Sequence, residues 1–464
     1  MNWVHHRLAL RALLTLALSA SCWLPAGAAE SEHLFWDRDQ QRVDANVQTW
    51  DVAPLLQKIA RRTGWQIYLQ PDTTQVVRTR FRNLSEGDAL RRLLGDLSFV
   101  LVPQTNGAAN LYVFRTSRDQ ATQLIRAADT AGKANTKRIE DELIAILKPG
   151  EKIEDLAKRL GAKVTGRIDE LNAYRLKFTD AESARKARQA LLDDPSVASV
   201  DYNYNVPRPE YAEAQGGNAP RFSLMPKSPA DGKFLTVGLI DSAVQSGLGR
   251  FGDFLLDSMS VAGKATPSDA EPTHGTAMAE TILNGLAAVS GKDGSTTVRI
   301  LPVDVYGNNS QSSTFDVAYG IFQAINAGAK IINLSMGSEA DSPFLHDVIK
   351  AGYDQGVIFF AAAGNEPVTT PFDPAAWPET TAVTAVDRRG NIASYANRGD
   401  FVKAAGPGTV AITFGNQTWL IAGTSSSTAY LSGVAAAIAE ATKKPLSEVQ
   451  AAVQKMMAVP KQGQ

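Results

Sequence analysis

Three polar motifs in the second half of the chain carry residue types that nucleophilic catalysis needs: Asp241 in GLIDS, His274 in THGTAMAE and Ser425 in AGTSSSTAYLSG. A serine hydroxyl is a weak nucleophile at neutral pH and needs a base within hydrogen-bond reach. An aspartate that accepts the second imidazole N–H fixes the tautomer of that base. The order Asp, His, Ser, at separations of 33 and 151 residues, is one of the three common chain orders of such a triad. The motifs therefore predict attack of the Ser425 hydroxyl on a carbonyl carbon.

Each motif taken singly has a simpler structural explanation. An aspartate after a strand is often a turn residue, and a serine before a helix is most often an N-cap. The catalytic interpretation rests on the three motifs together and on their order. The remaining histidines offer no competing base, because His5 and His6 lie in a predicted export signal, and His33 and His346 lie outside the motifs, where we expect surface side chains.

The ends of strands and the beginnings of helices would position these residues. From Lys233 onward, alanine-rich stretches alternate with short apolar runs, namely FLTVGLI, VRILPVDVY, KIINLSM, VIFFAAA and TAVTAV. Strands that are apolar throughout and separated by helices are typical of a parallel sheet covered on both faces. Functional groups in such sheets lie just beyond the carboxyl ends of the strands. The predicted fold class is α/β, a mostly parallel sheet with helices on both faces, preceded by two small α+β domains.

Residues 233–460 resemble the catalytic domain of the subtilase, or subtilisin-like serine peptidase, family. The resemblance is carried by GLIDS, HGT, NLSMGS, AAAGNE, ASYANRGDFVKAAGPG and GTSSSTAYLSG, which occur in the family's order. It implies a secreted serine endopeptidase, made as a precursor, that acts on polypeptide substrates. It also aligns Asn365 with the asparagine that stabilises the oxyanion, beside the backbone N–H of Ser425. The strand edge that holds an extended substrate aligns with Ser335, Met336 and Gly337.

Three positions depart from the usual family pattern. Ala243 replaces the glycine after Asp-Ser, Ala277 replaces the second histidine of the His motif, and Ala429 replaces the proline after the serine. The first change would constrain the turn that aims Asp241, and the last would alter the first turn of the serine helix. A second hypothesis is therefore a weakly active or inactive subtilase fold that serves as a binding module of the cell envelope.

Residues 32–116 have the apolar spacing of a small mixed domain. Ser85 with Asp88 resembles a helix-capping pair, and Asn106-Gly107 between two apolar runs predicts a hairpin. The segment resembles the short N-terminal domain shared by secretins and TonB-dependent receptors. That resemblance implies a protein partner in the cell envelope, and it leaves open a third hypothesis, an assembly factor in which the peptidase is secondary.

A second small domain is predicted at 138–208, after a polar linker at 117–137. Its helices and strands follow the order of a ferredoxin-like unit. It resembles the propeptide of subtilases, which in that family assists folding and inhibits by laying its C-terminal tail along the active site; an unrelated small domain is the alternative. Residues 209–232 are rich in Pro, Gly and polar residues, which predicts an exposed linker where the precursor is cut.

Residues 1–28 have the features of a secretory signal peptide, with Arg7 and Arg11 before an apolar run and a small-residue exit. The only cysteine, Cys22, lies inside this segment, which excludes thiol catalysis and disulfides in the mature chain. A lipoprotein modified at Cys22 is the alternative, although Ser19 stands where such signals usually carry leucine. No later segment has the apolar length of a transmembrane helix, so we expect an exported protein, periplasmic or extracellular.

The global charge is close to balanced, with 47 basic and 48 acidic residues, which argues against nucleic acid as a partner. Subtilases often bind structural calcium, and the family resemblance points to TILNGLAAVSGKDG as one such place. Only Asn284 and Asp293 offer carboxylate or carboxamide oxygens there. We therefore assign no metal site, and we expect no cofactor to be required for catalysis.

Overall fold

The computed structural model describes most of the chain and divides it into two compact units, residues 1–50 with 77–95, and residues 51–76 with 96–464. The predicted export signal, with Cys22, lies outside the described residues, and so does Asp293. The described ranges are 33–37, 42–71, 73–104, 107–121, 123–125, 138–209, 213–215, 223–247, 251–290, 294–338, 340–366, 369, 371–415 and 417–460.

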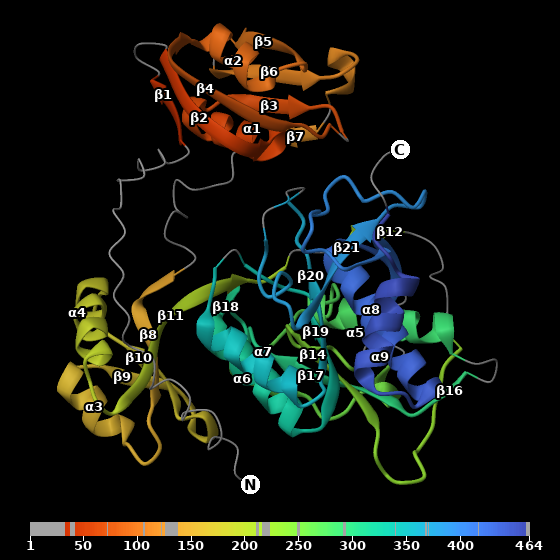
Figure 1. Ribbon diagram of the computed structural model, residues 1–464. Coiled ribbons are helices and arrows are strands. Elements are labelled where there is room, and N and C mark those ends of the chain that lie inside the picture. The colour runs from red at the N-terminus through yellow and green to blue at the C-terminus, as the bar shows by residue number, and fades with distance from the viewer. Residues whose placement is uncertain are drawn as a thin grey trace, which may run out of the picture. The chain divides into compact units, whose positions relative to one another are not determined.

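A seven-stranded parallel sheet forms the centre of the larger unit (Figure 1). Its strands are short and apolar, and the neighbours in the sheet run parallel throughout. This confirms the predicted fold class. The strand order is β15 (Met259–Ser260), β17 (Val298–Asp304), β14 (Leu235–Asp241), β19 (Ala329–Leu334), β20 (Ile358–Ala362), β21 (Thr380–Val386) and β22 (Ala404–Pro407).

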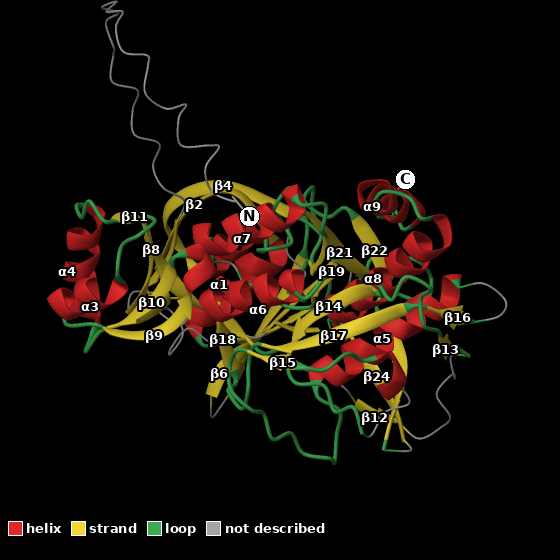
Figure 2. Cartoon of the chain, turned by 90° about the horizontal axis from the view of Figure 1, so that it is seen from below, coloured by secondary structure: helices red, strands yellow, loops and turns green. Residues whose placement is uncertain are grey.

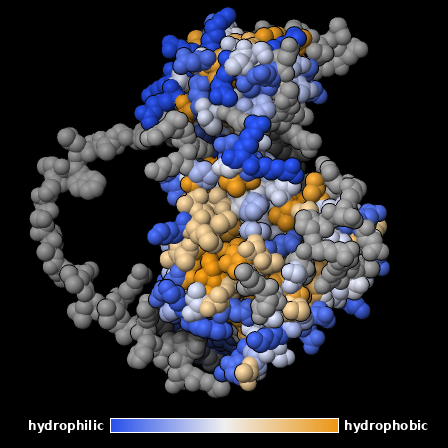
Figure 3. Space-filling view, turned by 90° about the vertical axis from the view of Figure 1, so that its right-hand side faces the viewer, coloured by the Kyte–Doolittle hydropathy of each residue, from blue (hydrophilic) through white to orange (hydrophobic). Residues whose placement is uncertain are grey.

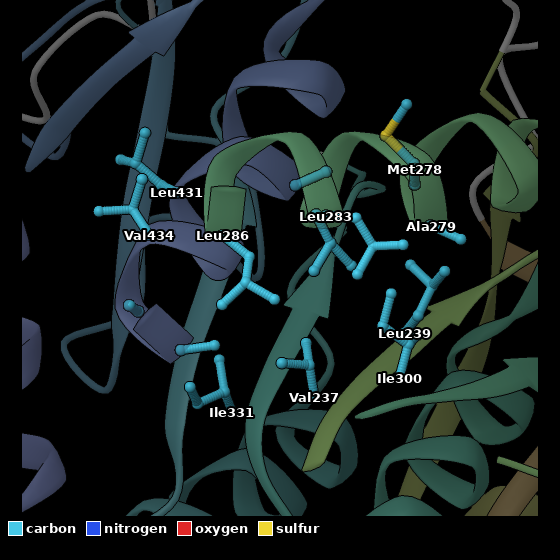
Figure 4. Close-up of a cluster of buried hydrophobic side chains, with 14 of the residues drawn as sticks. Val237, Leu239, Met278, Ala279, Leu283, Leu286, Ile300, Ile331, Leu431 and Val434 are labelled. Carbon is cyan, nitrogen blue, oxygen red and sulfur yellow. The ribbon is translucent and has the colours of Figure 1, made fainter. Parts of the chain in front are cut away.

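Helices cover both faces of this sheet (Figure 2). One face packs against α5 (His274–Val289), α8 (Thr424–Thr442) and α9 (Leu446–Met456). The other packs against α6 (Thr314–Asn326) and α7 (Pro343–Asp354). Side chains alternate between the faces, as strand geometry requires. The first core is seen in Figure 4, where side chains of α5 and α8 meet those of the sheet: Met278, Leu283, Leu286, Leu431, Val434, Val237, Leu239, Ile300 and Ile331.

Two glycines allow α5 and α8 to pack backbone against backbone. A Cβ atom at Gly433 would lie 1.9 Å from the carbonyl oxygen of Ile282, and one at Gly285 would lie 2.0 Å from that of Tyr430. Neither position could carry a side chain without separating the helices. Because α5 begins at His274 and Ser425 lies in the first turn of α8, this contact sets the spacing of two of the predicted catalytic residues.

Residues 138–209 form a separate layer of the larger unit, which we call the ferredoxin-like region. Its antiparallel strands are ordered β11-β8-β10-β9, with one helix after the first strand and one after the third. This agrees with the predicted order; the exposed strand β9 was not foreseen. The elements are β8 (Arg138–Leu147), α3 (Ile153–Leu160), β9 (Lys163–Ile168), η2 (Asp169–Leu171), β10 (Ala173–Lys177), α4 (Ala181–Leu192) and β11 (Val197–Pro207).

Short strands occur where the sequence predicts a linker at 209–232. β12 (Glu213–Gln215) pairs antiparallel with β24 (Gln417–Ala422), which also pairs with β23 (Thr409–Phe414). β13 (Met225–Pro226) pairs parallel with β16 (Ser295–Thr296). Main-chain pairing at sheet edges makes few demands on side chains, so the composition of this stretch did not reveal it. The remaining short elements are η3 (Gly252–Phe254) and β18 (Gln311–Ser313).

The N-terminal residues form two further sheets, one in each unit. The smaller unit contains β1 (His33–Asp37), β2 (Arg42–Asp51), β4 (Val76–Ser85) and α2 (Glu86–Leu94), and Ser85 caps α2 by accepting from Asp88 N as predicted. The larger unit contains α1 (Val52–Thr63), β3 (Gln66–Leu69), β5 (Ser98–Gln104), β6 (Gly107–Phe114), η1 (Arg118–Gln120) and β7 (Gln123–Ile125), with the sheet order β5-β6-β3-β7. The last two elements, η1 and β7, fall within the predicted linker at 117–137.

The surface mixes polar and apolar side chains, and Figure 3 shows one face on which a group of apolar residues is bordered by hydrophilic ones. Over the described ranges, no helix combines the length and the apolar character needed to cross a bilayer.

Candidate active site

Asp241 and His274 form a buried pair at the carboxyl end of the parallel sheet. Asp241 is the last residue of β14 and is fully buried, and His274 is the first residue of α5. His274 Nδ1 lies 2.8 Å from Asp241 Oδ1 and 2.9 Å from Oδ2. A carboxylate only accepts hydrogen bonds, so Nδ1 carries a proton and Nε2 is the nitrogen that can act as a base. The two sequence motifs thus meet in the geometry of an oriented base.

Local hydrogen bonds hold the beginning of α5 against the end of β14. Thr273 is the N-cap of the helix: its hydroxyl accepts from Thr276 N and donates to the Ala243 carbonyl at 2.6 Å. Gly275 N donates to Ser242 Oγ at 2.9 Å. A Cβ atom at Gly275 would lie 2.0 Å from Ser242 O, so glycine is required for this close approach.

Ser425 lies in the first turn of α8, two residues after the glycine that is the N-cap of this helix. Gly423 is the N-cap and has a φ of 150°. Ser425 is 7% exposed, and its hydroxyl donates to the Ser335 carbonyl at 3.1 Å. Its backbone N–H is among the first amides of a helix, which have no intrahelical acceptor. Rotation about the Cβ–Oγ bond can direct the hydroxyl proton away from Ser335.

A buried polar network lies beneath Ser425. Ser335 Oγ donates to the Ser425 carbonyl at 3.1 Å and accepts from Asn333 Nδ2 at 2.9 Å. Ser432 Oγ donates to Asn333 Oδ1 at 3.0 Å. Asn333, Ser335 and Ser432 have no exposed surface. The network ties the start of α8 to the end of β19 and so fixes the nucleophile candidate to the sheet.

Asn365 follows β20, and Thr424 orients its side chain. Asn365 Oδ1 accepts from Thr424 N at 2.8 Å and from Thr424 Oγ1 at 3.0 Å. Thr424 Oγ1 also accepts from Gly364 N at 3.2 Å. Because the carboxamide oxygen is engaged by Thr424, its nitrogen is the end that can donate to a bound group. Thr424 therefore holds the Asn365 side chain and directly precedes Ser425 in the chain. The sequence did not indicate this role of Thr424.

The predicted substrate edge, Ser335 to Gly337, directly follows β19. Met336 is 3% exposed and is part of the core under α6 and α7, where its sulfur accepts from the Tyr306 hydroxyl at 3.8 Å. A Cβ atom at Gly337 would lie 2.5 Å from the Phe372 ring. Glycine at this position therefore keeps the edge close to the loop that carries Phe372.

The C-terminal strand of the ferredoxin-like region lies along another edge of the site. β11 pairs antiparallel with β18, with Val206 opposite Ser312 and Pro207 opposite Gln311. Val206 is 3% exposed and is buried in the same core as Met336. The strand is longer than the sequence indicated, because after leaving β8 it finds this second partner. The strand β11 of the same chain thus lies in an extended conformation beside the predicted substrate edge.

Two side chains of β11 cap helices of the central sheet. Asn203 Oδ1 accepts from Phe315 N and from Thr314 Oγ1, both at 3.1 Å, at the start of α6. Asp201 Oδ2 accepts from Phe344 N at 3.0 Å and from Ser342 Oγ at 3.2 Å, at the start of α7. Burial raises the pKa of Asp201, and these hydrogen bonds partly offset that rise. Helix N-termini favour such acceptors.

A half-buried ion pair adds to this contact. Arg175 Nη1 of β10 lies 2.7 Å from Asp316 Oδ2 of α6, and its guanidinium lies 5.3 Å from the centre of the Phe315 ring. Burial raises the pKa of Asp316, against the attraction of Arg175. A Cβ atom at Gly166 would lie 2.6 Å from the Phe315 ring, so the region is shaped to receive that ring.

The three departures from the family pattern fit the structure without strain. Among the described residues, the non-glycine positions with positive φ are Asn83, Asn172 and Lys443. Ala243 is thus outside the left-handed region, and the expected constraint on the turn is absent there. Ala277 and Ala429 are fully buried in the core between α5, α8 and the sheet.

The described residues offer no group of three or more His, Cys, Asp or Glu side chains that could hold a metal ion. Asn284 lies on α5, and its Nδ2 donates to the Ala411 carbonyl at 3.3 Å. The absence of an assigned calcium site there stays a prediction. His346 contacts Glu379 at 2.9 Å and stacks on Trp377, which is a structural role distant from the motifs in sequence.

Two family models match parts of the chain. Residues 232–459 match the model of the Subtilase family, and residues 126–203 match that of the Fervidolysin N-terminal prodomain. The predicted likeness of residues 138–208 to a subtilase propeptide is confirmed by the second match. The likeness of residues 32–116 to secretin and TonB domains stays a prediction.

Individual relatives cover different parts of the chain. The chain is 32% identical over 169 residues to the thermophilic serine proteinase of Bacillus sp. (strain AK1). The match covers 36% of this chain and 42% of that protein. It is 30% identical over 268 residues to the thermostable alkaline protease of Halalkalibacterium halodurans, covering 56% of this chain and 71% of that protein. The crystal structure of fervidolysin from Fervidobacterium pennivorans aligns with a TM-score of 0.53 at 17% identity, over 67% of this chain and 56% of that one. The structural likeness shows the fold.

Proposed function

The chain belongs to the subtilase family, and on that premise we propose that it is an exported serine endopeptidase, made as a precursor, that hydrolyses peptide bonds through an acyl-enzyme on Ser425. The observation that supports this most directly is the buried contact of His274 Nδ1 with both carboxylate oxygens of Asp241, at 2.8 and 2.9 Å. Such a contact fixes the tautomer of a base and stabilises the imidazolium that forms when a hydroxyl is deprotonated.

In the first step, the Ser425 hydroxyl turns from the Ser335 carbonyl, gives its proton to His274 Nε2 and attacks the peptide carbonyl carbon. His274 then gives this proton to the leaving amine, and the peptide C–N bond breaks. In the second step, water attacks the ester, gives a proton to His274, and the Ser425 oxygen leaves with that proton. Asp241 keeps its charge throughout.

Asn365 Nδ2 and the Ser425 amide would donate to the oxyanion of each tetrahedral intermediate. One such donor is worth roughly 3 to 4 kcal/mol in subtilisin itself, where an asparagine has this role. The support is the engagement of Asn365 Oδ1 by Thr424, which holds the carboxamide in one orientation. No metal or other cofactor takes part in these steps.

A polypeptide substrate would bind as an added strand between β18 and the edge formed by Ser335, Met336 and Gly337. Main-chain pairing gives affinity in this mode, and alternate side chains give specificity. β11 already pairs with β18 in this way. We therefore also propose that the ferredoxin-like region inhibits the uncut chain from within, by occupying the substrate edge.

Expression of the full chain beside its Ser425→Ala variant tests these proposals. We expect self-cleavage within residues 209–232 in the parent and an intact chain in Ser425→Ala. Intact mass spectrometry follows both chains. A fluorophosphonate probe should label the processed parent once, at Ser425. A correctly folded parent that is neither cut nor labelled would instead support the hypothesis of an inactive fold that acts as a binding module.

A further inference from the structure

A buried carboxylate beside the active site has one oxygen that the fold does not use. Asp304 ends β17 and is 4% exposed, and its neighbour across the sheet is Asp241. Its Oδ1 accepts from Tyr306 N and Gly307 N, both at 2.9 Å. Its Oδ2 is buried and has no hydrogen-bond partner among the described residues. A buried carboxylate oxygen without a hydrogen bond lowers the stability of the fold, so a nearby cation or hydrogen-bond donor would be favourable here.

The turn that follows β17 accounts for only one of the two carboxylate oxygens of Asp304. An asparagine would serve the two amides of Tyr306 and Gly307 equally well through its carbonyl oxygen. It would also avoid placing a second carboxylate next to Asp241. Burial is the main cause that raises the pKa of Asp304, and the charge of Asp241 adds to it. The charge of Asp304 is therefore held at a cost that the turn does not require.

The side chain of Arg208 enters the same place from the end of β11. Its backbone N donates to the Ser310 carbonyl at 3.0 Å, which continues the pairing of β11 with β18. Its Nη2 donates to the Gly307 carbonyl at 2.9 Å, and the guanidinium carbon lies 5.4 Å from the centre of the Tyr306 ring. Arg208 Nε is buried without a hydrogen-bond partner in the described part of the chain. The cation therefore contacts the two residues whose amides Asp304 holds.

We propose that Asp304, the Gly307 carbonyl and the Tyr306 ring form a receptor for an arginine side chain of the bound peptide, which Arg208 occupies in the uncut chain. The inference rests on the proposed function, since it names a substrate preference of that site. Asp304 acts on the guanidinium through the low-dielectric interior, where a charge reaches farther than in water. The planar group suits the receptor, because it can stack on an aromatic ring while donating to a carbonyl.

Neighbouring contacts fix the register in which this arginine is presented. The Tyr306 hydroxyl donates to the Pro207 carbonyl at 3.0 Å, and Val206 is buried in the core. The main chain on both sides of the arginine position is thus held. We expect the cleaved peptides to carry arginine at one fixed distance on the N-terminal side of the cut.

Hydrogen exchange in the full chain tests the receptor without any need for catalysis. In the Ser425→Ala background, Asp304→Asn and Arg208→Met should each raise the exchange rate of the Asn205, Val206 and Arg208 amides by about tenfold, the effect of losing the attraction between two charges in the low-dielectric interior. The double variant should raise it no further than Arg208→Met alone, because that variant already removes the cation on which Asp304 acts. Additive effects, or no effect of Asp304→Asn, would overturn the proposal.

If Asp304→Asn does not fold, two variants of the other partner carry the same test. Arg208→Lys keeps the charge and loses the planar group, so its exchange rate should lie between those of the parent and Arg208→Met. Equal rates in all three chains would refute a receptor for a guanidinium.

Digestion of a random peptide library tests the substrate preference. The processed enzyme should enrich arginine at one position, Asp304→Asn should reduce that enrichment about tenfold, and Tyr306→Phe should retain it, because the ring remains. Fluorophosphonate titration separates the two levels of failure. Labelled enzyme without arginine enrichment contradicts the receptor alone, whereas an unlabelled parent contradicts the proposed function and leaves the exchange result to decide on the receptor.

Discussion

Replacing Gly433 by alanine should separate the two helices that carry His274 and Ser425. The added Cβ would lie 1.9 Å from Ile282 O and 2.7 Å from Leu286 N. Ordinary contact begins near 3.4 Å, so α5 and α8 must move apart by about 1.5 Å at this point. Such overpacking costs about 1 to 3 kcal/mol, against which alanine regains up to about 1 kcal/mol of helix propensity.

The net destabilisation should lower the thermal midpoint by roughly 1 to 4 °C for a unit of this size, measured by calorimetry in the Ser425→Ala background to prevent self-digestion. In the active chain, a shift of the base by about 1 Å should lower kcat by roughly tenfold or more, with a small change in KM. Gly87→Ala is the matched control, since its Cβ would meet only Arg91 Nη1, at 4.0 Å. If Gly433→Ala has the midpoint and kcat of its parent, α5 and α8 do not set the geometry of the site.

Three further predictions concern single groups. Thr424→Val removes the hydroxyl that donates to Asn365 Oδ1 at 3.0 Å, so steady-state kinetics should show kcat lowered about tenfold with KM nearly unchanged; a kcat equal to the parent's would contradict the positioning role. Burial raises the pKa of Asp373 to about 6, so its contribution to stability is full below its ordinary value of 3.8 and is lost as pH rises through about 6. Asp373→Asn should therefore stabilise the Ser425→Ala chain by about 1 kcal/mol at pH 8, after allowance for solvent screening, and not at pH 3.5, as measured by urea unfolding; the same gain at both values would refute this. A chelator should leave the thermal midpoint unchanged, and a clear drop would contradict the expectation that no bound metal stabilises the chain.

The sequence predicted the parallel sheet because its strands are apolar on both faces and end at polar residues. Asp241 could be assigned to the end of a strand, and His274 to the start of a helix, from the local pattern alone. The exposed strand β9 was missed because its side chains alternate between exposed and half-buried positions, so it has no apolar stripe. β7 and β12 are three residues each and are defined by main-chain pairing with distant strands, which composition does not reveal.

The supporting residues of the site were beyond local reasoning for a related reason. Thr424 and Ser242 are polar residues beside motif residues, and either could equally be a cap. Their roles depend on contacts with segments 60 and 33 positions away. Asp304 was read only as part of an apolar strand, and its unpaired oxygen is visible only when its surroundings are known.

Inhibition by the ferredoxin-like region, as proposed above, requires contacts that can form and also be given up. Asn203 and Asp201 cap α6 and α7, but each helix also has its own N-cap serine, Ser313 accepting from Asp316 N and Ser342 accepting from Leu345 N. Loss of β11 would leave amides that water can reach, rather than a helix end without any cap. The carboxylate of Asp201 would also regain hydration, which lowers the cost of separation. The region therefore adds to the stability of these helices without being required for their formation, which is what a removable inhibitor needs.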